Sequence, residues 1–340
     1  MILDKKLSSY IFVKYILIVI FLLMFIIVNI NLFIDPLYNW GITNYFDFRR
    51  NDFDERIQKT NYLANINKEY DAVLLGNSRS TYIDTSKFNF DVKVFNYSVN
   101  AMSIYEYDQV LENFIKLTGK QPKIIFIGID PFDFKGEESR KLENILLEST
   151  SLEKKIKNLL SFDLLIFSLK AIVKTIQVNL DLADRKQRYY DNNLVKGNKE
   201  ANLISNQKYI HVNYEMDYNI DYNLFNEYKK LKNKFKDSEF VIYCLPFHKE
   251  LIESWQQDKL FDKKNKDFIN NLVNIFDKIY YFNYINEYNS SYLNYYDRYH
   301  FYPYLGDIIA EKINELYFYK KSDFGYIINK ENSSFFLDKR

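Results

Sequence analysis

Apolar residues follow one another almost without interruption from Tyr10 to Ile34, near the start of the chain. About 20 apolar residues, at a helical rise of about 1.5 Å each, span the hydrocarbon core of a bilayer. Lysines precede or begin this run and Asp35 follows it. Since basic residues favour the cytoplasmic side, we expect residues 1–35 to form a cytoplasmic tail and a single-pass transmembrane anchor, with residues 36–340 extracytoplasmic. A cleaved signal peptide is disfavoured, because the run is long and no small-residue cleavage motif follows it.

Beyond the anchor, short apolar runs alternate with longer stretches of helical spacing. The apolar runs have the length and residue types of buried strands, and they cover residues 71–76, 92–96, 123–129, 239–245 and 279–282. The main helical stretches between them cover residues 105–117, 222–236 and 263–276. Strands that alternate with helices predict a three-layer α/β/α fold with a mostly parallel sheet and right-handed connections.

The segment from about 135 to 221 interrupts this alternation and is predicted to be a helical insertion. Residues 137–160 and 161–180 have helical patterns. Lys170 and Lys174 oppose a second membrane span, because a charge at the bilayer centre costs about 2.5–3.5 kcal/mol on insertion scales. We favour a helical cap over the active edge of the sheet. The alternative is a surface helix that docks on the membrane or on a membrane partner.

Composition narrows the classes of partner. The net charge is +1 with both signs interspersed, which opposes a nucleic-acid partner because such partners need a concentrated basic face. The single cysteine, Cys244, lies in an apolar run and is expected in the core. Three histidines and one cysteine offer no metal-ligand spacing, so neither a metal nor a cofactor is expected. Arg49, Arg50, Arg56 and Lys59, in the polar approach to the sheet, are predicted on a solvated helix face.

Candidate chemistry lies at the end of the first predicted strand and near the C-terminus. Ser78 follows the run 71–75, where open α/β sheets bind their ligands. Asp297 and His300 form an Asp-x-x-His motif. A serine hydroxyl becomes a nucleophile when an imidazole takes its proton, and a carboxylate orients that imidazole. The start of a helix after Ser78 is expected to aim backbone N–H groups at a developing oxyanion.

The order of these motifs carries a resemblance to a known family. From about residue 70 to 320, the chain resembles the SGNH (GDSL-like) hydrolase superfamily, in particular the membrane-anchored proteins of cell-surface acylation. These include the alginate O-acetylation proteins and, more distantly, the teichoic acid D-alanine transfer protein. The matching features, in chain order, are the anchor, Gly76-x-Ser78-Arg79, a strand ending in Asp130-Pro131-Phe132, a strand ending in Pro246-x-His248, and Asp297-x-x-His300. The resemblance implies a flavodoxin-like fold, with Ser78 as nucleophile, His300 as general base and Asp297 as its orienting acid.

Departures from the family pattern concern the oxyanion hole. The glycine of the second block is replaced by Ser98, which retains a backbone N–H. The asparagine of the third block is replaced by Asp130, and an ionised aspartate offers no donor. Three explanations stay open: Asp130 is protonated, Asn100 supplies the donor, or Asp130 has a structural role before Pro131. We favour the second or the third.

Two further residues are candidates for contact with the substrate. Arg79 follows the predicted nucleophile, and it either holds an anionic substrate or orders the loop through an ion pair. His248 lies just past the carboxyl end of the fourth predicted strand, so we expect it near the site and in contact with the substrate.

The expected function is that of an extracytoplasmic serine acyltransferase or esterase. It would modify a cell-surface polysaccharide through an acyl-Ser78 intermediate, and acetyl is the most plausible acyl group. The resemblance implies a partner of the membrane-bound O-acyltransferase class that brings the acyl group across the bilayer. The alternative is a non-catalytic accessory or glycan-binding subunit of a surface-polymer complex, which the replacement at Asp130 favours and the Ser78–His300 pair opposes.

Overall fold

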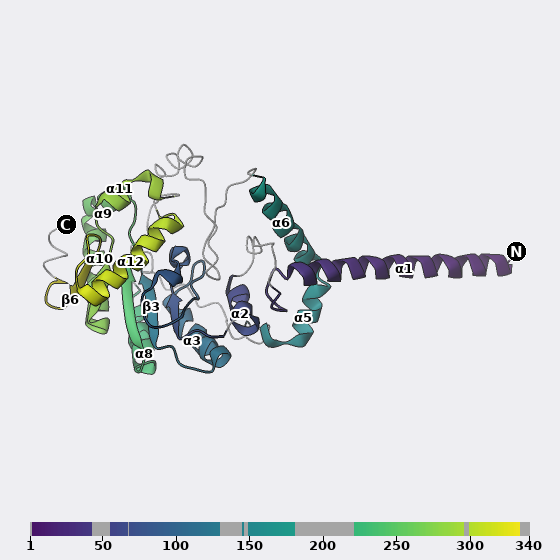
Figure 1. Ribbon diagram of the computed structural model, residues 1–340, viewed down its shortest axis with the longest axis horizontal. Coiled ribbons are helices and arrows are strands. Elements are labelled where there is room, and N and C mark those ends of the chain that lie inside the picture. Colours follow the sequence, from purple (N-terminus) through teal and green to yellow (C-terminus); the bar gives the residue numbers. More distant parts are fainter. Residues whose placement is uncertain are drawn as a thin grey trace. The chain divides into compact units, whose positions relative to one another are not determined.

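The chain forms two compact units in a computed structural model (Figure 1). We call them the anchor unit, made of residues 1–67 and 144–183, and the sheet unit, made of residues 68–143 and 184–340. The structure describes residues 2–42, 55–66, 68–129, 145, 149–180, 221–295 and 299–333.

The anchor unit is helical. Its longer helices are α1 (Ile2–Ile34), α2 (Glu55–Asn65), α5 (Leu152–Leu159) and α6 (Phe162–Asn179). Within the described part of the chain, α1 is the one helix long and apolar enough to cross a membrane, over Tyr10–Ile34. These are the residues of the predicted anchor, and the orientation of that anchor stays a prediction. The predicted helix at 161–180 is confirmed as α6, and α5 lies within the predicted stretch 137–160.

A buried amide joins α1 to the two helices of the insertion. The Asn31 side chain donates hydrogen bonds to the carbonyl oxygens of Leu159 and Ser161, over 3.0 and 3.1 Å. Its Oδ1 accepts a hydrogen bond from Ser168 Oγ over 3.0 Å, and Asn31 is fully buried. The corner between α5 and α6 therefore packs on the C-terminal part of α1, so the structure groups these helices with the anchor.

The helix α2 corrects one prediction, because Arg56 and Lys59 are buried rather than solvated. Arg49 and Arg50, which share that prediction, lie outside the described residues. The neighbouring polar side chains of α2 bind the backbone that follows α1. Gln58 Nε2 donates to the Pro36 carbonyl over 2.7 Å, and Asn61 Nδ2 donates to the Leu37 carbonyl over 2.8 Å. Polar residues of α2 thus donate hydrogen bonds to the backbone carbonyl groups of a buried loop, a role that their polarity alone does not indicate.

The sheet unit contains a mostly parallel sheet of six strands in the order β2-β1-β3-β4-β5-β6. The strands are β1 (Ala72–Leu75), β2 (Val94–Asn96), β3 (Ile124–Ile129), β4 (Glu239–Cys244), β5 (Lys278–Tyr281) and β6 (Tyr326–Asn329). The first five are parallel, and β6 runs antiparallel to β5. All five predicted strands are confirmed, whereas β6 was not predicted. The fold is therefore mixed α/β with a mostly parallel sheet.

Helices and short turns connect the strands. The helices are α3 (Ile104–Thr118), α8 (Asn223–Lys234), α9 (Lys249–Gln257), α10 (Lys259–Phe276), α11 (Glu287–Ser290) and α12 (Pro303–Tyr319). The 3₁₀ turns are η1 (Ser80–Tyr82), η2 (Thr85–Lys87) and η4 (Tyr292–Asn294). The three predicted helices are confirmed as α3, α8 and α10. The sequence also marks the ends of α3, with a Ser103–Glu106 capping box at its start and Gly119 at φ 77° after its end.

Both faces of the central strands are buried. Successive side chains of a strand point to opposite faces, and every residue of β1 and β3 is buried. Alternate residues, such as Leu74, Phe126 and Tyr243, share one apolar cluster with Leu305 and Ile309 of α12. Full burial explains why these strands are continuously apolar rather than alternating.

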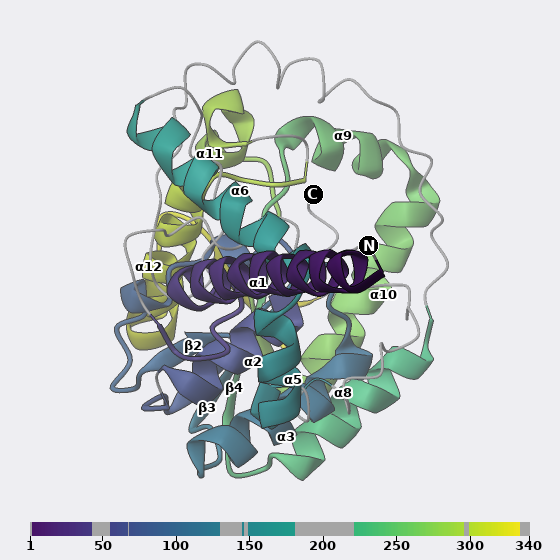
Figure 2. The same cartoon turned by 90° about the vertical axis from the view of Figure 1, so that its right-hand side faces the viewer.

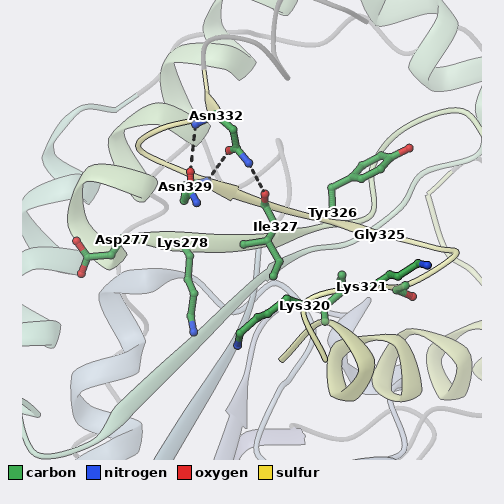
Figure 3. Close-up of a pocket in the computed structure, with 11 residues that line it drawn as sticks. Asp277, Lys278, Lys320, Lys321, Gly325, Tyr326, Ile327, Asn329 and Asn332 are labelled. Atoms are coloured by element: carbon green, nitrogen blue, oxygen red, sulfur yellow. Dashed lines mark hydrogen bonds between the residues drawn. The ribbon is translucent and has the colours of Figure 1, made fainter. Parts of the chain in front are cut away.

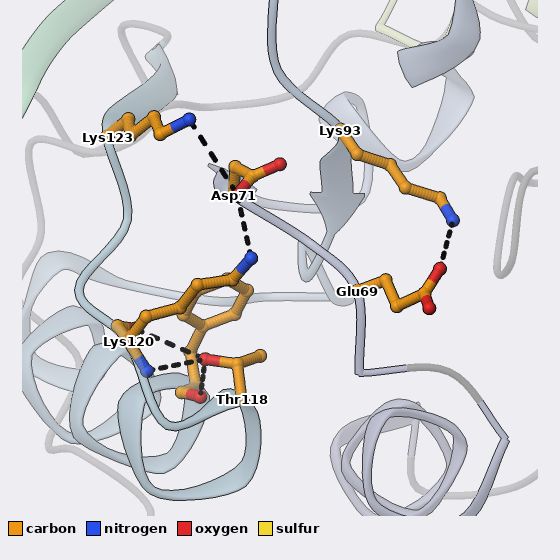
Figure 4. Close-up of polar contacts among 7 residues, drawn as sticks. Glu69, Asp71, Lys93, Thr118, Lys120 and Lys123 are labelled. Carbon is orange, nitrogen blue, oxygen red and sulfur yellow. Dashed lines mark hydrogen bonds and ion pairs between the residues drawn. The ribbon is translucent and has the colours of Figure 1, made fainter.

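The amino ends of the strands carry ion pairs (Figure 4). Asp71, just before β1, accepts a hydrogen bond from Lys120 Nζ over 2.7 Å and lies 3.9 Å from Lys123 Nζ. The hydrogen bond from Lys120 is the main cause of a lowered pKa of the Asp71 carboxyl. Glu69 and Lys93 form a looser exposed pair at 3.7 Å. This edge is therefore a solvated polar surface, and the predicted chemistry lies at the opposite end of the strands.

Candidate active site

Ser78 lies in a turn just beyond the carboxyl end of β1. The Ser80 N–H donates to the Asn77 carbonyl over 3.1 Å and closes this turn, which leaves Ser78 partly exposed. The chain continues from β1 to β2 on one side of it, and β3 lies on the other side. Such a reversal of strand order creates a crevice where open α/β sheets bind ligands. The fold therefore places Ser78 at a topological switch point.

The turn after Ser78 packs closely on the ends of β1 and β3 because two glycines make room for it. A Cβ atom at Gly76 would lie 2.2 Å from Ser80 Oγ, and one at Gly128 would lie 2.1 Å from the same atom. Tyr243 lies beside Gly128 and is fully buried, and this burial raises the pKa of its phenol. The phenol is therefore neutral, and any larger residue at either glycine would push the Ser78 turn away from the sheet.

The segment after Ser78 corrects the expectation of a helix there. Only the three-residue turns η1 and η2 lie between β1 and β2. A single 3₁₀ turn has no aligned set of free N–H groups comparable to a helix start. Stabilisation of an oxyanion by a helix N-terminus after Ser78 is therefore not part of this site.

His300 lies beside Ser78, although 222 positions separate them in the sequence. Ser78 Oγ and His300 Nε2 are 3.0 Å apart, within hydrogen-bond distance. A β-bridge between Tyr295 and Phe301 closes the base of the loop that carries His300. The Tyr302 N–H also donates to the Asn294 carbonyl there, over 2.8 Å. The structure thus brings the predicted nucleophile and base together. The predicted orienting acid, Asp297, lies outside the described residues.

Arg79 is buried and ties the loops around this pair together. Its Nε donates to the Tyr299 carbonyl over 2.8 Å, one residue before His300. Its Nη2 donates to the carbonyl of Pro246, after β4. The guanidinium carbon lies 3.6 Å from the centre of the Phe247 ring, a cation–π contact. Arg79 is only 2% exposed, so these contacts favour the loop-ordering role, through backbone carbonyls, over direct contact with an anionic substrate.

Ser98 is buried, and its backbone N–H is already used. That N–H donates to Asn96 Oδ1 over 3.1 Å. The Asn96 amide in turn donates to the carbonyls of Ser80 and Ile83, both over 3.1 Å. The Ser98 N–H is therefore engaged within the protein, and its role toward an oxyanion stays a prediction. Asn96, which the sequence analysis missed, holds the turn that follows Ser78.

The remaining candidates have different positions. The Val99 N–H donates to the Gly76 carbonyl over 3.2 Å, so Asn100 follows at the same edge of the sheet as Ser78, and it is exposed. Asn100 therefore remains a candidate oxyanion donor.

Asp130 lies outside the described residues. His248 is fully buried: its Nδ1 accepts a hydrogen bond from the Glu250 N–H at the start of α9 over 3.4 Å. This capping role gives no support to the predicted contact of His248 with the substrate.

Gly306 is a further residue that supports the site and that sequence reasoning missed. It lies in the first turn of α12, shortly after His300. A Cβ atom at this position would lie 2.1 Å from the Tyr82 carbonyl oxygen. The absence of a side chain therefore lets α12 approach η1, which follows Ser78. Close helix packing of this kind is a common reason for glycine inside a helix.

A pocket elsewhere in the sheet unit lies away from this pair (Figure 3). Its lining includes Asp277, Lys278 and Lys320. Its lining also includes Tyr326, which pairs with Tyr281 at the end of β5, so the pocket runs along the β5–β6 edge of the sheet. Burial and the nearby charge of Lys320 lower the pKa of Lys278. No part of the Ser78–His300 pair lines this pocket.

In comparisons with known proteins, no family model matches this chain and no curated protein matches it. The function must therefore be inferred from the chemistry of the site. Among the described residues, no group of three or more His, Cys, Asp or Glu side chains is arranged to hold a metal ion. What the described residues do provide is a partly exposed serine hydroxyl in hydrogen-bond contact with an imidazole nitrogen.

Proposed function

We propose that this protein is an extracytoplasmic serine-dependent acyltransferase or esterase that modifies a cell-surface polysaccharide through an acyl-Ser78 intermediate. The observation that carries the proposal is the 3.0 Å distance between Ser78 Oγ and His300 Nε2 at the switch point of the sheet. Two residues so far apart in the sequence meet where such sheets bind ligands. A serine and an imidazole in this contact form the minimal unit of nucleophilic acyl transfer.

The proposed reaction has two steps. In the first, Ser78 Oγ attacks the carbonyl carbon of an acyl ester while His300 Nε2 takes the hydroxyl proton, and this proton then passes to the leaving oxygen. In the second, a sugar hydroxyl or water gives its proton to His300 and attacks the acyl-Ser78 ester. The bond between the acyl carbon and Ser78 Oγ then breaks, and His300 returns the proton to Ser78 Oγ, which releases the product and restores the serine. Asp297 would orient His300 by resemblance. Asn100 is our candidate donor to the oxyanion, because the Ser98 N–H is engaged.

The fold and the anchor support the wider assignment. The order β2-β1-β3-β4-β5 is that of flavodoxin-like doubly wound sheets, as the SGNH resemblance requires. An apolar α1 with basic residues at its start supports a single-pass anchor with the sheet unit outside the membrane. That location suits transfer to a nascent surface glycan, with a membrane-bound O-acyltransferase partner, implied by the resemblance alone, as the source of the acyl group.

One observation favours a second candidate, a non-catalytic SGNH-like accessory or glycan-binding subunit. The engaged N–H of buried Ser98 removes one predicted oxyanion donor. Loss of a single such donor lowers kcat by about 10²–10³-fold in serine hydrolases. A site weakened in this way could serve binding while keeping the Ser78–His300 contact.

The test is acyl release from a chromogenic acetyl ester by the full-length protein in detergent. We expect Ser78→Ala and His300→Ala each to lower kcat by about 10³-fold or more. Ser86→Ala, at an exposed serine in the neighbouring η2 turn, is the matched control and should leave turnover unchanged. Turnover that survives in Ser78→Ala contradicts the proposal. No turnover together with no covalent labelling of Ser78 by a fluorophosphonate favours the accessory candidate.

A further inference from the structure

The helix α6 of the anchor unit is apolar on two opposite sides. One side, which includes Leu164 and Ala171, is buried, and Ser168 on this side donates to Asn31 of α1. The opposite side carries six exposed apolar residues, of which Leu180 lies just past the helix end. We call this set the outer stripe, and it consists of Phe162, Ile166, Leu169, Val173, Ile176 and Leu180.

The outer stripe is too regular to be a scatter of exposed apolar residues. At about 100° per residue, its six members fall within an arc of about 80°. Each of them is between 44% and 66% exposed. A helix that packs one side on its own protein and turns the other to water is polar on that outer side. The outer stripe therefore requires an apolar environment.

The position of α6 along α1 indicates which environment that is. Tyr10 begins the apolar run, and Asn31, which binds the α5–α6 corner, lies 21 positions later. This corresponds to about 32 Å of helix, against about 30 Å for the hydrocarbon core of a bilayer. The α5–α6 corner therefore lies at the depth where the hydrocarbon ends. A fully hydrogen-bonded Asn31 is expected at that depth, where water is scarce.

The direction and residues of α5 and α6 also fit a membrane surface. Figures 1 and 2 show that the two helices leave the end of α1 on different sides, and that α6 runs obliquely to the axis of α1. Leu152 and Ile156, one helical turn apart in α5, are exposed apolar residues. Exposed Lys154 and Lys157 in α5 add positive charge for anionic headgroups.

We propose that α5 and α6 lie in the interface of the bilayer that α1 spans, with the outer stripe among the lipid acyl chains. This inference rests on the membrane anchoring in the proposed function, and it goes beyond a single-helix tether. Three helices joined at Asn31 would form a fixed platform at the membrane surface. A protein partner is the competing occupant, but the shared depth and the continuity with the apolar surface of α1 favour lipid.

The test uses the full-length protein with Cys244→Ala, reconstituted in vesicles of phosphatidylcholine and phosphatidylglycerol. A single cysteine is introduced by Val173→Cys or Ile166→Cys in the outer stripe and labelled with a nitrobenzoxadiazole dye. Lys229→Cys, exposed on α8 of the sheet unit, is the control. Leu22→Cys, exposed on α1, reports on the anchor itself. Emission and its quenching by a doxyl-labelled lipid are measured for each variant.

We expect the dyes attached at positions 173 and 166 to emit at a shorter wavelength than in water. The doxyl lipid should quench this emission, as it quenches that of the dye attached at position 22. The Lys229 label should keep the emission of a dye in water. Unshifted, unquenched labels in the outer stripe beside a quenched Leu22 label would overturn the inference and leave the anchoring intact. A blue shift without lipid quenching would overturn it in favour of a protein partner. An unquenched Leu22 label would overturn the anchoring together with the inference.

Discussion

Arg79 is expected to act on catalysis indirectly, as a positioning residue for His300. Its guanidinium holds the carbonyl of Tyr299, the residue before His300, and the carbonyl of Pro246 after β4. The substitution Arg79→Lys keeps the positive charge but not the planar fork that reaches both carbonyls at once. One of the two carbonyls, together with the loop that carries it, should then lose its attachment to the Ser78 turn.

The size of the effect follows from the bond that is lost. A hydrogen bond to a charged donor contributes about 1.5–3 kcal/mol, so the free energy of unfolding should fall by about 2–3 kcal/mol. The catalytic rate should fall by more than the loss of stability alone would cause, because a misplacement of about 1 Å can lower the rate about 100-fold. We therefore expect labelling of Ser78 by a fluorophosphonate, and kcat for ester turnover, to fall about 100-fold, with little change in KM.

Leu272→Ala separates positioning from simple destabilisation. Leu272 is fully buried in α10, and a leucine-to-alanine change in a core costs about 2–5 kcal/mol. This variant should lose as much stability as Arg79→Lys and still label Ser78 at the normal rate at temperatures where both stay folded. Equal labelling rates in the two variants would refute the role of Arg79 in holding the His300 loop.

Two further outcomes are expected. Gly306→Ala should lower the free energy of unfolding by about 1–3 kcal/mol in denaturant titrations and slow the labelling of Ser78, because the new Cβ meets the Tyr82 carbonyl. Helix propensity alone predicts an increase in stability, and such an increase would contradict the close packing. Asp71→Asn should cost up to about 1 kcal/mol at pH 7. The folded-state pKa of Asp71 is lowered from 3.8. The difference in the free energy of unfolding between the two proteins should therefore be full above pH 3.8 and vanish as the pH falls through the folded pKa. A difference that persists in acid would show that the ion pair is not its source.

The positions of the main strands along the chain could be predicted from the sequence because each strand is a short apolar run with polar flanks. Burial on both faces makes such runs stand out. The strand β6 gives a weaker signal, since Tyr326–Asn329 is a short, partly exposed edge strand. The helix α12 was missed although Pro303 stands at its first position, which is a recognised start signal.

The Ser78–His300 pair was predicted through the resemblance, but most of its support was not. Arg79 binds two backbone carbonyls, one of them 167 positions away. Every residue has a carbonyl, so no side chain in the sequence marks the partner. The capture of the Ser98 N–H by Asn96 is different, because asparagine often binds the backbone two residues on. That local signal could have identified the engaged N–H from the sequence.

The outer stripe shows how a correct rule led to an incomplete interpretation. Lys170 opposed a transmembrane span for residues 161–180, and the structure places its ammonium 5.3 Å from the Phe167 ring, on the flank of α6. The rule excludes a helix that crosses the bilayer, but it does not exclude a helix that lies in the bilayer interface. A helix whose charges lie on its flanks, and whose apolar residues lie on two opposite sides, can pack on α1 with one side and contact lipid with the other. Asn31 gave the missing hint, since a polar side chain near the end of an apolar span needs a partner. The partner is more than a hundred positions away, so only the structure identifies it.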